Sequence, residues 1–148
     1  MDPKKYEEII KFAIDKEIGA FHFYTRASQV AKYSGARELF IDFSKEEEKH
    51  RKLLEDITVE KIAQLKVEKA PNLKISDYMV DIEFRPDLSY ADILRVAMKM
   101  EERSLKLYTD LKETAKDQEM NKLFDFLAQQ EANHKYFIEK KYDEDILK

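Results

Sequence analysis

Cysteine and tryptophan are absent from this 148-residue sequence, and glycine and proline occur only 2 and 3 times. Without cysteine the chain cannot form disulfides, iron–sulfur clusters or thiolate zinc sites, and we expect a protein of a reducing compartment, the cytoplasm. Any metal must then be bound by carboxylate and imidazole groups. The scarcity of turn-forming residues nearly excludes an all-β fold and favours helices.

The balance of charge and the lack of long apolar runs argue against nucleic-acid and membrane partners. The chain carries 27 Lys and Arg against 31 Asp and Glu, a formal net charge of −4, and no basic block. No window reaches the roughly 18 consecutive apolar residues of a membrane span. Acidic residues stand near the N-terminus, where a signal peptide has its apolar core. The length predicts one domain.

Four stretches of the sequence carry apolar residues at helical spacing. The first runs from about residue 4 to 32, and the second begins after a turn at residues 33–35 and can continue through Ile62 and Leu65. Residues 68–88 contain two prolines and a β-leaning run at residues 75–84, which predicts a long connection with one short helix. A third stretch opens at Ser89, followed by Asp92 as in a helix-start signal, and a polar turn at residues 115–117 precedes the fourth.

These stretches form two helical hairpins, at about residues 4–67 and 89–141, joined by a crossover at about residues 68–88. The predicted fold class is therefore all-α, a ferritin-like four-helix bundle in a single domain, residues 1–148. The first hairpin maps onto the second at a constant offset of 84 residues. The matched pairs include Ala13/Ala97, Glu17/Glu101, Ala20/Ser104, Tyr24/Tyr108, Phe40/Phe124, Glu47/Glu131 and His50/His134. Matched histidines and glutamates indicate a true internal repeat.

Each predicted helix directs one glutamate toward the apolar interior. On the second helix, Glu47 and His50 fall within about one-fifth of a turn of the apolar line at 100° per residue. Glu131 and His134 repeat this arrangement on the fourth helix. The complete inward set is Glu17, Glu47, His50, Glu101, Glu131 and His134.

Four buried carboxylates require positive charge between them, because an ionised carboxylate buried alone costs several kcal/mol. No Lys or Arg stands on these inward lines nearby, so the sequence predicts two divalent cations, with the two imidazoles completing the coordination. The two glutamates of each hairpin are 30 residues apart and centred on the predicted turn, which places them level. One Glu from each of two helices, with Glu-x-x-His from each of the other two, is the pattern of di-iron and di-manganese bundles.

Several neighbouring residues are not expected to bind metal. Glu46 and Glu48 fall to the sides of the second helix, and His22 points off the site line and has no partner in the repeat. Tyr24 and Tyr108 each stand seven residues beyond a glutamate of the set. Two interpretations of these tyrosines stay open: a core aromatic with a satisfied hydroxyl, or a hydrogen bond from the hydroxyl to a metal-binding carboxylate.

The motifs Ala13-x3-Glu17-x6-Tyr24 with Glu47-x2-His50, and Ala97-x3-Glu101-x6-Tyr108 with Glu131-x2-His134, resemble those of the rubrerythrin family of ferritin-like di-iron proteins. The resemblance covers about residues 5–55 and 90–140. It implies terminal ligands at Glu17 and Glu101, bridging ligands at Glu47 and Glu131, and one nitrogen ligand per metal from His50 and His134. It also implies iron as the usual metal, reaction with peroxide or oxygen, and a homodimer.

Two departures from the family pattern bear on function. Rubrerythrins commonly carry a further ligand glutamate three residues after the third-helix glutamate, and here that position is Ser104. The chain therefore lacks the carboxylate that supports peroxide-driven movement of one iron between ligands. Full-length members also carry a cysteine-ligated rubredoxin module, whereas this chain has no cysteine, so we expect its electrons to come from a separate donor such as a rubredoxin.

The leading functional hypothesis is a non-haem di-iron oxidoreductase that reduces hydrogen peroxide or oxygen at a site of four glutamates and two histidines. Spacing distinguishes neither the two oxidants nor iron from manganese or a mixed pair of metals. Two alternatives stay open: a ferroxidase or iron-handling protein, and a metal-stabilised helical binding module without turnover. The long crossover also permits exchange of hairpins between two chains of a dimer.

Overall fold

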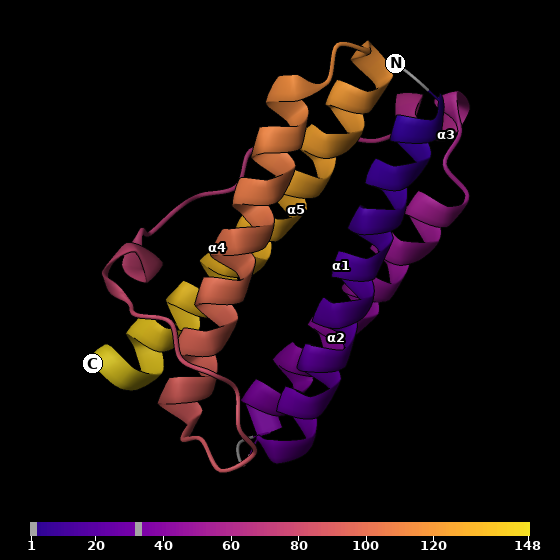
Figure 1. Ribbon diagram of the computed structural model, residues 1–148. Helices are drawn as coiled ribbons and strands as arrows, with labels where there is room; N and C mark the ends of the chain where they lie inside the picture. The colour runs from indigo at the N-terminus through magenta and orange to yellow at the C-terminus, as the bar shows by residue number, and fades with distance from the viewer. Residues whose placement is uncertain (1–2, 32–33) are drawn as a thin grey trace. The chain divides into compact units, whose positions relative to one another are not determined.

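The computed structural model describes residues 3–31 and 34–148, and these two ranges contain helices and connections but no strand (Figure 1). The long helices are α1 (Pro3–Val30), α2 (Ser34–Glu55), α4 (Tyr90–Thr114) and α5 (Gln118–Tyr142). The short ones are α3 (Val59–Ala63), the 3₁₀ turn η1 (Ile75–Tyr78) and the π turn η2 (Asp143–Leu147). The predicted all-α class is confirmed. Within the described ranges, every helix is too short or too polar to cross a bilayer.

The chain divides into two compact units, Met1–Gln64 and Leu65–Lys148. In the first unit α1 and α2 pack as an antiparallel hairpin, as the apolar periodicity predicts. In the second unit α4 and α5 form another hairpin, and η1 of the crossover packs on α4. The two predicted hairpins and the long crossover are therefore present, and their union in a single domain stays a prediction.

Aromatic stacking fills the middle of the first hairpin. Tyr24 of α1 is fully buried and stacks on Phe40 of α2, with ring centroids 6.1 Å apart and an interplanar angle of 22°. Phe43 meets the same tyrosine edge-on at 5.4 Å. Small residues on α1, among them Ala13 and Ala20, are buried, which permits close approach of the two helices. These residues form the apolar line that sequence periodicity predicts.

The second hairpin repeats this packing at the same offset. Tyr108 of α4 stacks on Phe124 of α5 with centroids 6.5 Å apart and an interplanar angle of 20°. Both rings are buried, as are Leu94 of α4 and Leu127 of α5. The internal repeat therefore extends from residue types to the geometry of the side chains within each unit.

Two boundaries in the first hairpin differ from the prediction. The turn expected at residues 33–35 is wrong at Ser34 and Gly35, which belong to α2. Tyr33 lies outside the described residues. The second helix also does not continue through Ile62 and Leu65 but ends at Glu55. Residues 57–59 are β-branched, and Thr58 caps α3 by accepting a hydrogen bond from the Lys61 amide at 3.2 Å.

The boundaries predicted for the second hairpin are confirmed. Ser89 caps α4, with its hydroxyl accepting a hydrogen bond from the Asp92 amide at 3.2 Å. Asp117 caps α5 in the predicted polar turn and accepts hydrogen bonds from the amides of Glu119 and Met120. Hydrogen bonding with Glu119, and with the Met120 amide, lowers the pKa of the Asp117 carboxyl from its usual value.

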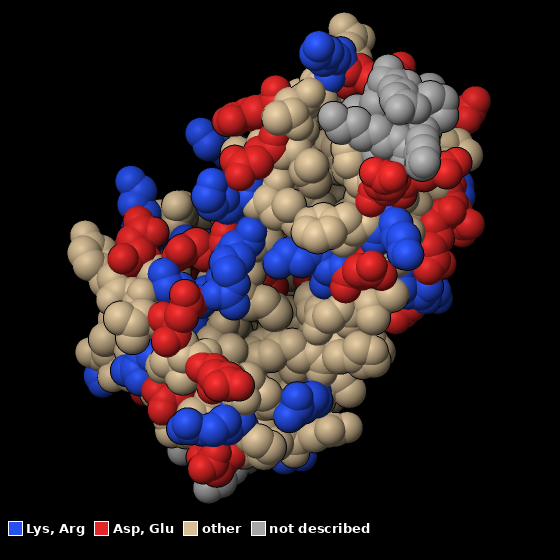
Figure 2. All heavy atoms as spheres, viewed as in Figure 1, with Lys and Arg blue, Asp and Glu red and all other residues tan. Residues whose placement is uncertain are grey.

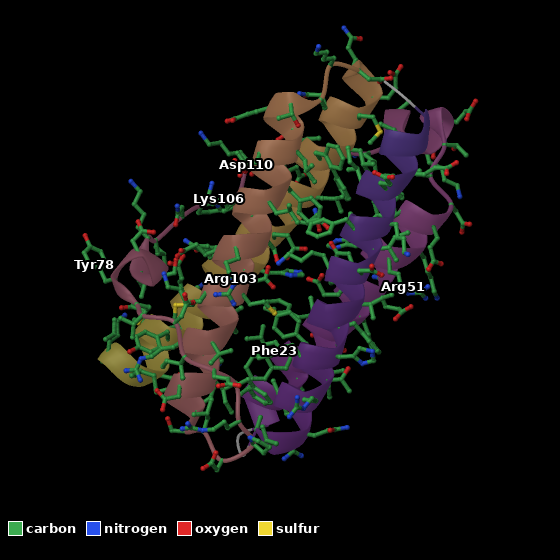
Figure 3. All side chains as sticks on the ribbon, in the orientation of Figure 1. Phe23, Arg51, Tyr78, Arg103, Lys106 and Asp110 are labelled. Carbon is green, nitrogen blue, oxygen red and sulfur yellow. The ribbon has the colours of Figure 1, made fainter. Side chains whose placement is uncertain are left out.

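Charged side chains of both signs are interspersed on the face shown in Figure 2. Many of them pair along a helix, such as Lys106 and Asp110 on α4, whose charged atoms are 3.1 Å apart (Figure 3). An exposed pair of this kind contributes at most about 1 kcal/mol. The stability of each hairpin therefore depends mainly on its buried stripe.

The cap at Ser89 gives a direct test of the fold. We expect Ser89→Ala to lower the free energy of unfolding by about 1 kcal/mol, because one amide in the first turn of α4 loses its acceptor. Ser89→Asp keeps an acceptor oxygen and serves as the matched control. Urea unfolding followed by circular dichroism measures both, and equal stability of the alanine variant and the wild type would contradict the capping role.

Candidate metal centre

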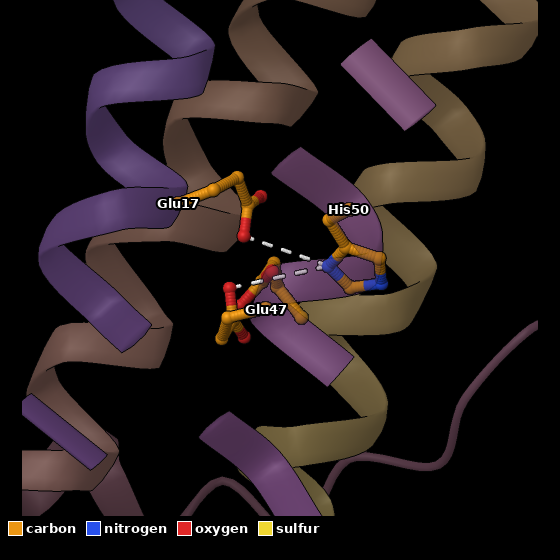
Figure 4. A group of neighbouring side chains, drawn as sticks. Glu17, Glu47 and His50 are labelled. Atoms are coloured by element: carbon orange, nitrogen blue, oxygen red, sulfur yellow. Dashed lines mark ion pairs between the residues drawn. The ribbon is translucent and has the colours of Figure 1, made fainter. Parts of the chain in front are cut away.

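The first half-site lies between α1 and α2 and consists of Glu17, Glu47 and His50, all three buried. Glu47 and His50 are three residues apart on α2 and so share one face of that helix. The Nδ1 atom of His50 lies 3.5 Å from Glu17 Oε2 and 3.9 Å from Glu47 Oε2 (Figure 4). The level placement that the sequence predicts for the two glutamates is therefore present in this unit.

The second half-site lies between α4 and α5 and consists of Glu101, Glu131 and His134, which are also buried. The Nδ1 atom of His134 lies 3.7 Å from Glu101 Oε1 and 3.9 Å from Glu131 Oε2. These distances match those of the first half-site within a few tenths of an ångström. Each unit thus presents the same donor set, two carboxylates and one imidazole.

The spacing within each half-site suits a metal ion better than direct hydrogen bonding between histidine and glutamate. Separations of 3.5–3.9 Å between these nitrogen and oxygen atoms exceed the roughly 2.7–3.2 Å of an N–H···O hydrogen bond. Donor atoms held about 2.1 Å from an octahedral ion are about 3.0 to 4.2 Å apart. The donor atoms of each set lie within 4.8 Å of one another. Each half-site therefore fits the protein ligands of one divalent cation.

A buried cation lies on α5 at a position that the sequence does not single out. Lys135, four residues beyond Glu131, is only 3% exposed. Its Nζ atom lies 3.2 Å from both carboxylate oxygens of the buried Glu139. The lysine charge is therefore matched by a fifth buried carboxylate, Glu139.

Sequence periodicity does not reveal this Lys135–Glu139 pair, because its counterparts at the repeat offset are Arg51 and Glu55, an ordinary pair on an outward face. Both partners of the buried pair also contact the crossover, through Asn72 and Ser76. A signal is present only in the spacing, since Lys135 and Glu139 follow Glu131 at intervals of four residues. That spacing is equally common on solvated helices.

The remaining residues singled out by the sequence fall outside the donor sets or beside them. Tyr24 and Tyr108 are fully buried in the aromatic stacks, and the role of their hydroxyls stays a prediction. His22 is exposed and meets Phe21 edge-on, while Glu46 pairs with Lys49 on the surface of α2. Ser104 is buried on α4, one turn beyond Glu101, so a small hydroxyl side chain stands there.

A family model described as Rubrerythrin matches residues 8–142, a span that includes both half-sites and the crossover. Comparisons with curated proteins and with solved structures find no match. The match agrees with the motifs in both hairpins, with the all-α architecture and with the duplicated set of two glutamates and one histidine. The chain therefore belongs to the rubrerythrin family and has the ferritin-like fold.

Proposed function

We propose that this chain is a non-haem di-iron oxidoreductase, in which the two half-sites together bind two iron ions. The observation that carries the proposal is the occurrence of one buried donor set, two carboxylates and one imidazole, in each unit at equal spacing. Four carboxylate charges balance two divalent cations, and two neutral imidazoles add ligands without adding charge. Membership of a family whose members are commonly di-iron oxidoreductases supports the choice of metal.

The side chains of the proposed site bind and orient the metals. Glu17 and Glu101 are proposed as terminal ligands, and His50 and His134 as one nitrogen ligand for each metal. Glu47 and Glu131, one from each half-site, are proposed as the bridging carboxylates. Because all six side chains are buried, the protein excludes bulk water and holds its donor atoms in place before metal arrives.

If these six side chains hold two ferrous ions, the bound metals would supply the two electrons needed to reduce hydrogen peroxide, or to react with oxygen. Tyr24 and Tyr108 are proposed to donate hydrogen bonds to the metal-binding carboxylates and so to limit their rotation. A buried serine at position 104 gives no further carboxylate ligand on α4. We therefore propose a site of six protein ligands whose ligand set does not change during turnover.

We propose that electrons reach the site from a second protein, since no cysteine among these 148 residues can hold a rubredoxin-type centre. A separate donor such as a rubredoxin is the proposed partner, and a homodimer is the proposed assembly. The cytoplasm, whose reducing conditions suit a ferrous enzyme, is the proposed compartment.

Removing one proposed ligand should weaken metal binding. It should also lower the free energy of unfolding of the iron-loaded protein and raise that of the metal-free protein. We expect Glu131→Gln to lower the affinity for ferrous iron at least about 100-fold, since the variant loses a carboxylate that is proposed to bind the metal directly. Without metal the same variant should be more stable than the wild type by about 1–4 kcal/mol, because it buries one carboxylate fewer beside Glu101. Anaerobic iron titration and urea unfolding with and without iron measure the two effects.

Glu46→Gln is the matched control for that variant, since Glu46 is also a helical glutamate but pairs only with Lys49 at the surface. We expect it to leave the iron content at two per chain and both stabilities within about 0.5 kcal/mol of the wild type. Unchanged iron binding in Glu131→Gln and in His50→Ala would refute the assignment of the ligands.

The choice of oxidant is tested by rapid mixing of the anaerobic ferrous protein with peroxide and, separately, with oxygen. We expect oxidation of two irons per chain, faster with peroxide, and about 10- to 100-fold slower oxidation in Tyr24→Phe and Tyr108→Phe. Iron that leaves the protein after oxidation would favour a ferroxidase or iron-handling role. Metal-dependent stability without turnover would favour a structural binding module, and either result would overturn the proposed activity.

A further inference from the structure

The side of α1 that points away from the proposed metal ligands carries an aromatic ring in solvent. Phe12 is 56% exposed, although a side chain of this size gains stability from burial. At 100° per residue it lies about 20° from Gly19 around the helix and about 140° from Glu17. We call the exposed residues within about 40° of Gly19 the outer line of α1. They are Glu8, Phe12, Asp15, Gly19 and Arg26.

The direction of the outer line is set within the first unit alone. Buried residues of α1, among them Ala13, Glu17 and Tyr24, lie on the side of the helix where α2 packs. The outer line is on the opposite side of the same helix. Its exposure therefore follows from the hairpin of α1 and α2, wherever the second unit lies.

Gly19 leaves room in the middle of the outer line. It stands inside a helix of 28 residues, where glycine is less favourable than alanine. A Cβ atom added to Gly19 would meet no atom of the described chain within 4 Å, apart from the adjacent turns of α1 itself. The packing of this chain therefore does not require a glycine there. A glycine on a helix surface does permit a second backbone to approach closely.

The internal repeat shows that the corresponding side of α4 is partly covered. At the offset of 84 residues, Phe12 corresponds to Val96, which is only 7% exposed, and Gly19 corresponds to Arg103. Arg103, labelled in Figure 3, pairs with Asp81 of the crossover at 2.6 Å, and η1 packs on the same helix. The second unit thus places its crossover along a side that the first unit leaves exposed. The exposed ring of Phe12 indicates that this side of α1 is covered by another surface.

The charges of the outer line identify that surface as a second copy of the chain. Glu8 and Asp15 lie on the N-terminal side of Gly19, and Arg26 lies on its C-terminal side. If two copies of α1 cross antiparallel at Gly19, residues equally distant from it lie level, as Phe12 and Arg26 do. Arg26 of the partner subunit then lies beside Phe12, with Glu8 and Asp15 one turn away on either side. A parallel crossing would instead align like charges.

We propose that the outer line of α1 is a homodimer interface, in which two copies of α1 cross antiparallel at Gly19. The inference rests on the homodimer of the proposed function and requires no metal. The guanidinium of Arg26 packs on the partner's Phe12 ring and pairs with the partner's Glu8 and Asp15. Two-fold symmetry forms this contact twice, so the surface is complementary to itself. The side of α1 that bears Glu17 stays free.

The first experiment reverses the charge of one half of the line at a time, in the full-length metal-free chain. Arg26→Glu makes both halves acidic, and Glu8→Lys/Asp15→Lys makes both halves basic, so each variant repels its own copy. We expect the Kd of the homodimer to rise at least about 10-fold in each variant, measured by sedimentation velocity. Lys45→Glu, at an exposed position of α2, is the matched control and should change Kd less than about 2-fold.

Mixing the two charge variants gives the sharpest test of the antiparallel crossing. In an equimolar mixture the acidic half of one chain meets the basic half of the other at both contacts, so we expect a 1:1 heterodimer with a Kd close to that of the wild type. Native mass spectrometry identifies this heterodimer by its mass. Its absence, when both homodimers are weakened, would contradict the antiparallel arrangement.

The second experiment separates the interface from the fold. Gly19→Gln replaces glycine by a better helix former at a position with free space, so the monomer should unfold at a higher urea concentration. The longer side chain holds the two helices apart and should raise the Kd of the dimer at least about 10-fold. A more stable monomer that dimerises less well excludes misfolding as the cause. Phe12→Ala should raise Kd about 30-fold, because it removes the aromatic anchor.

The outcomes distinguish this inference from the proposed metal chemistry. A wild-type chain that stays monomeric at about 100 μM overturns the interface. Dimers that persist equally in all the variants also overturn it, because they are formed elsewhere, for example by exchange of hairpins. Neither result bears on iron binding, which is titrated separately. A chain that dimerises as expected but binds no iron overturns the metal chemistry and supports the interface.

Discussion

The burial of two carboxylates inside each hairpin is the constraint on which the rest of this structure depends. Each unit buries two glutamates beside one histidine, where an isolated ionised carboxylate is strongly disfavoured. Lys135 does not relieve this, because Glu139 already matches its charge. The apolar stacks around Tyr24 and Tyr108 therefore have to supply enough stability to keep these carboxylates buried.

That constraint also explains why so much of the candidate site could be predicted from the sequence. A charged carboxylate on an apolar helical line conflicts with the apolar interior that this line faces. Such a carboxylate occurs four times at matched positions, and two of the four have a histidine three residues later. Helical geometry then dictates that Glu47 and His50 share a face, and equal spacing from the turn dictates that Glu17 lies level with them. The structure of each unit bears out both inferences, at distances that differ by only tenths of an ångström between the hairpins.

Features that depend on contacts between distant segments could not be predicted in the same way. The apolar line through Ile62 continues that of α2, and Ile62 is buried as this pattern requires. Periodicity alone therefore did not show that a separate helix, α3, begins after Thr58. Lys135 and Glu139 have the spacing of a surface pair, and only the path of the crossover across α5 buries them. Periodicity reports the face of a residue within its own helix and carries no information about an irregular segment that later covers that face.

The two hairpins are therefore alike at the proposed metal ligands and different where the chain connects them. Duplication accounts for the likeness, and it suits the proposed site, since two metals of the same kind would require two similar donor sets. The crossover is the part of the second unit that has no counterpart in the first, and it is bound by a pair whose repeat equivalent faces solvent. The irregular segment that lies on α5, and not the helical pattern, therefore decides which of the two equivalent ion pairs is buried.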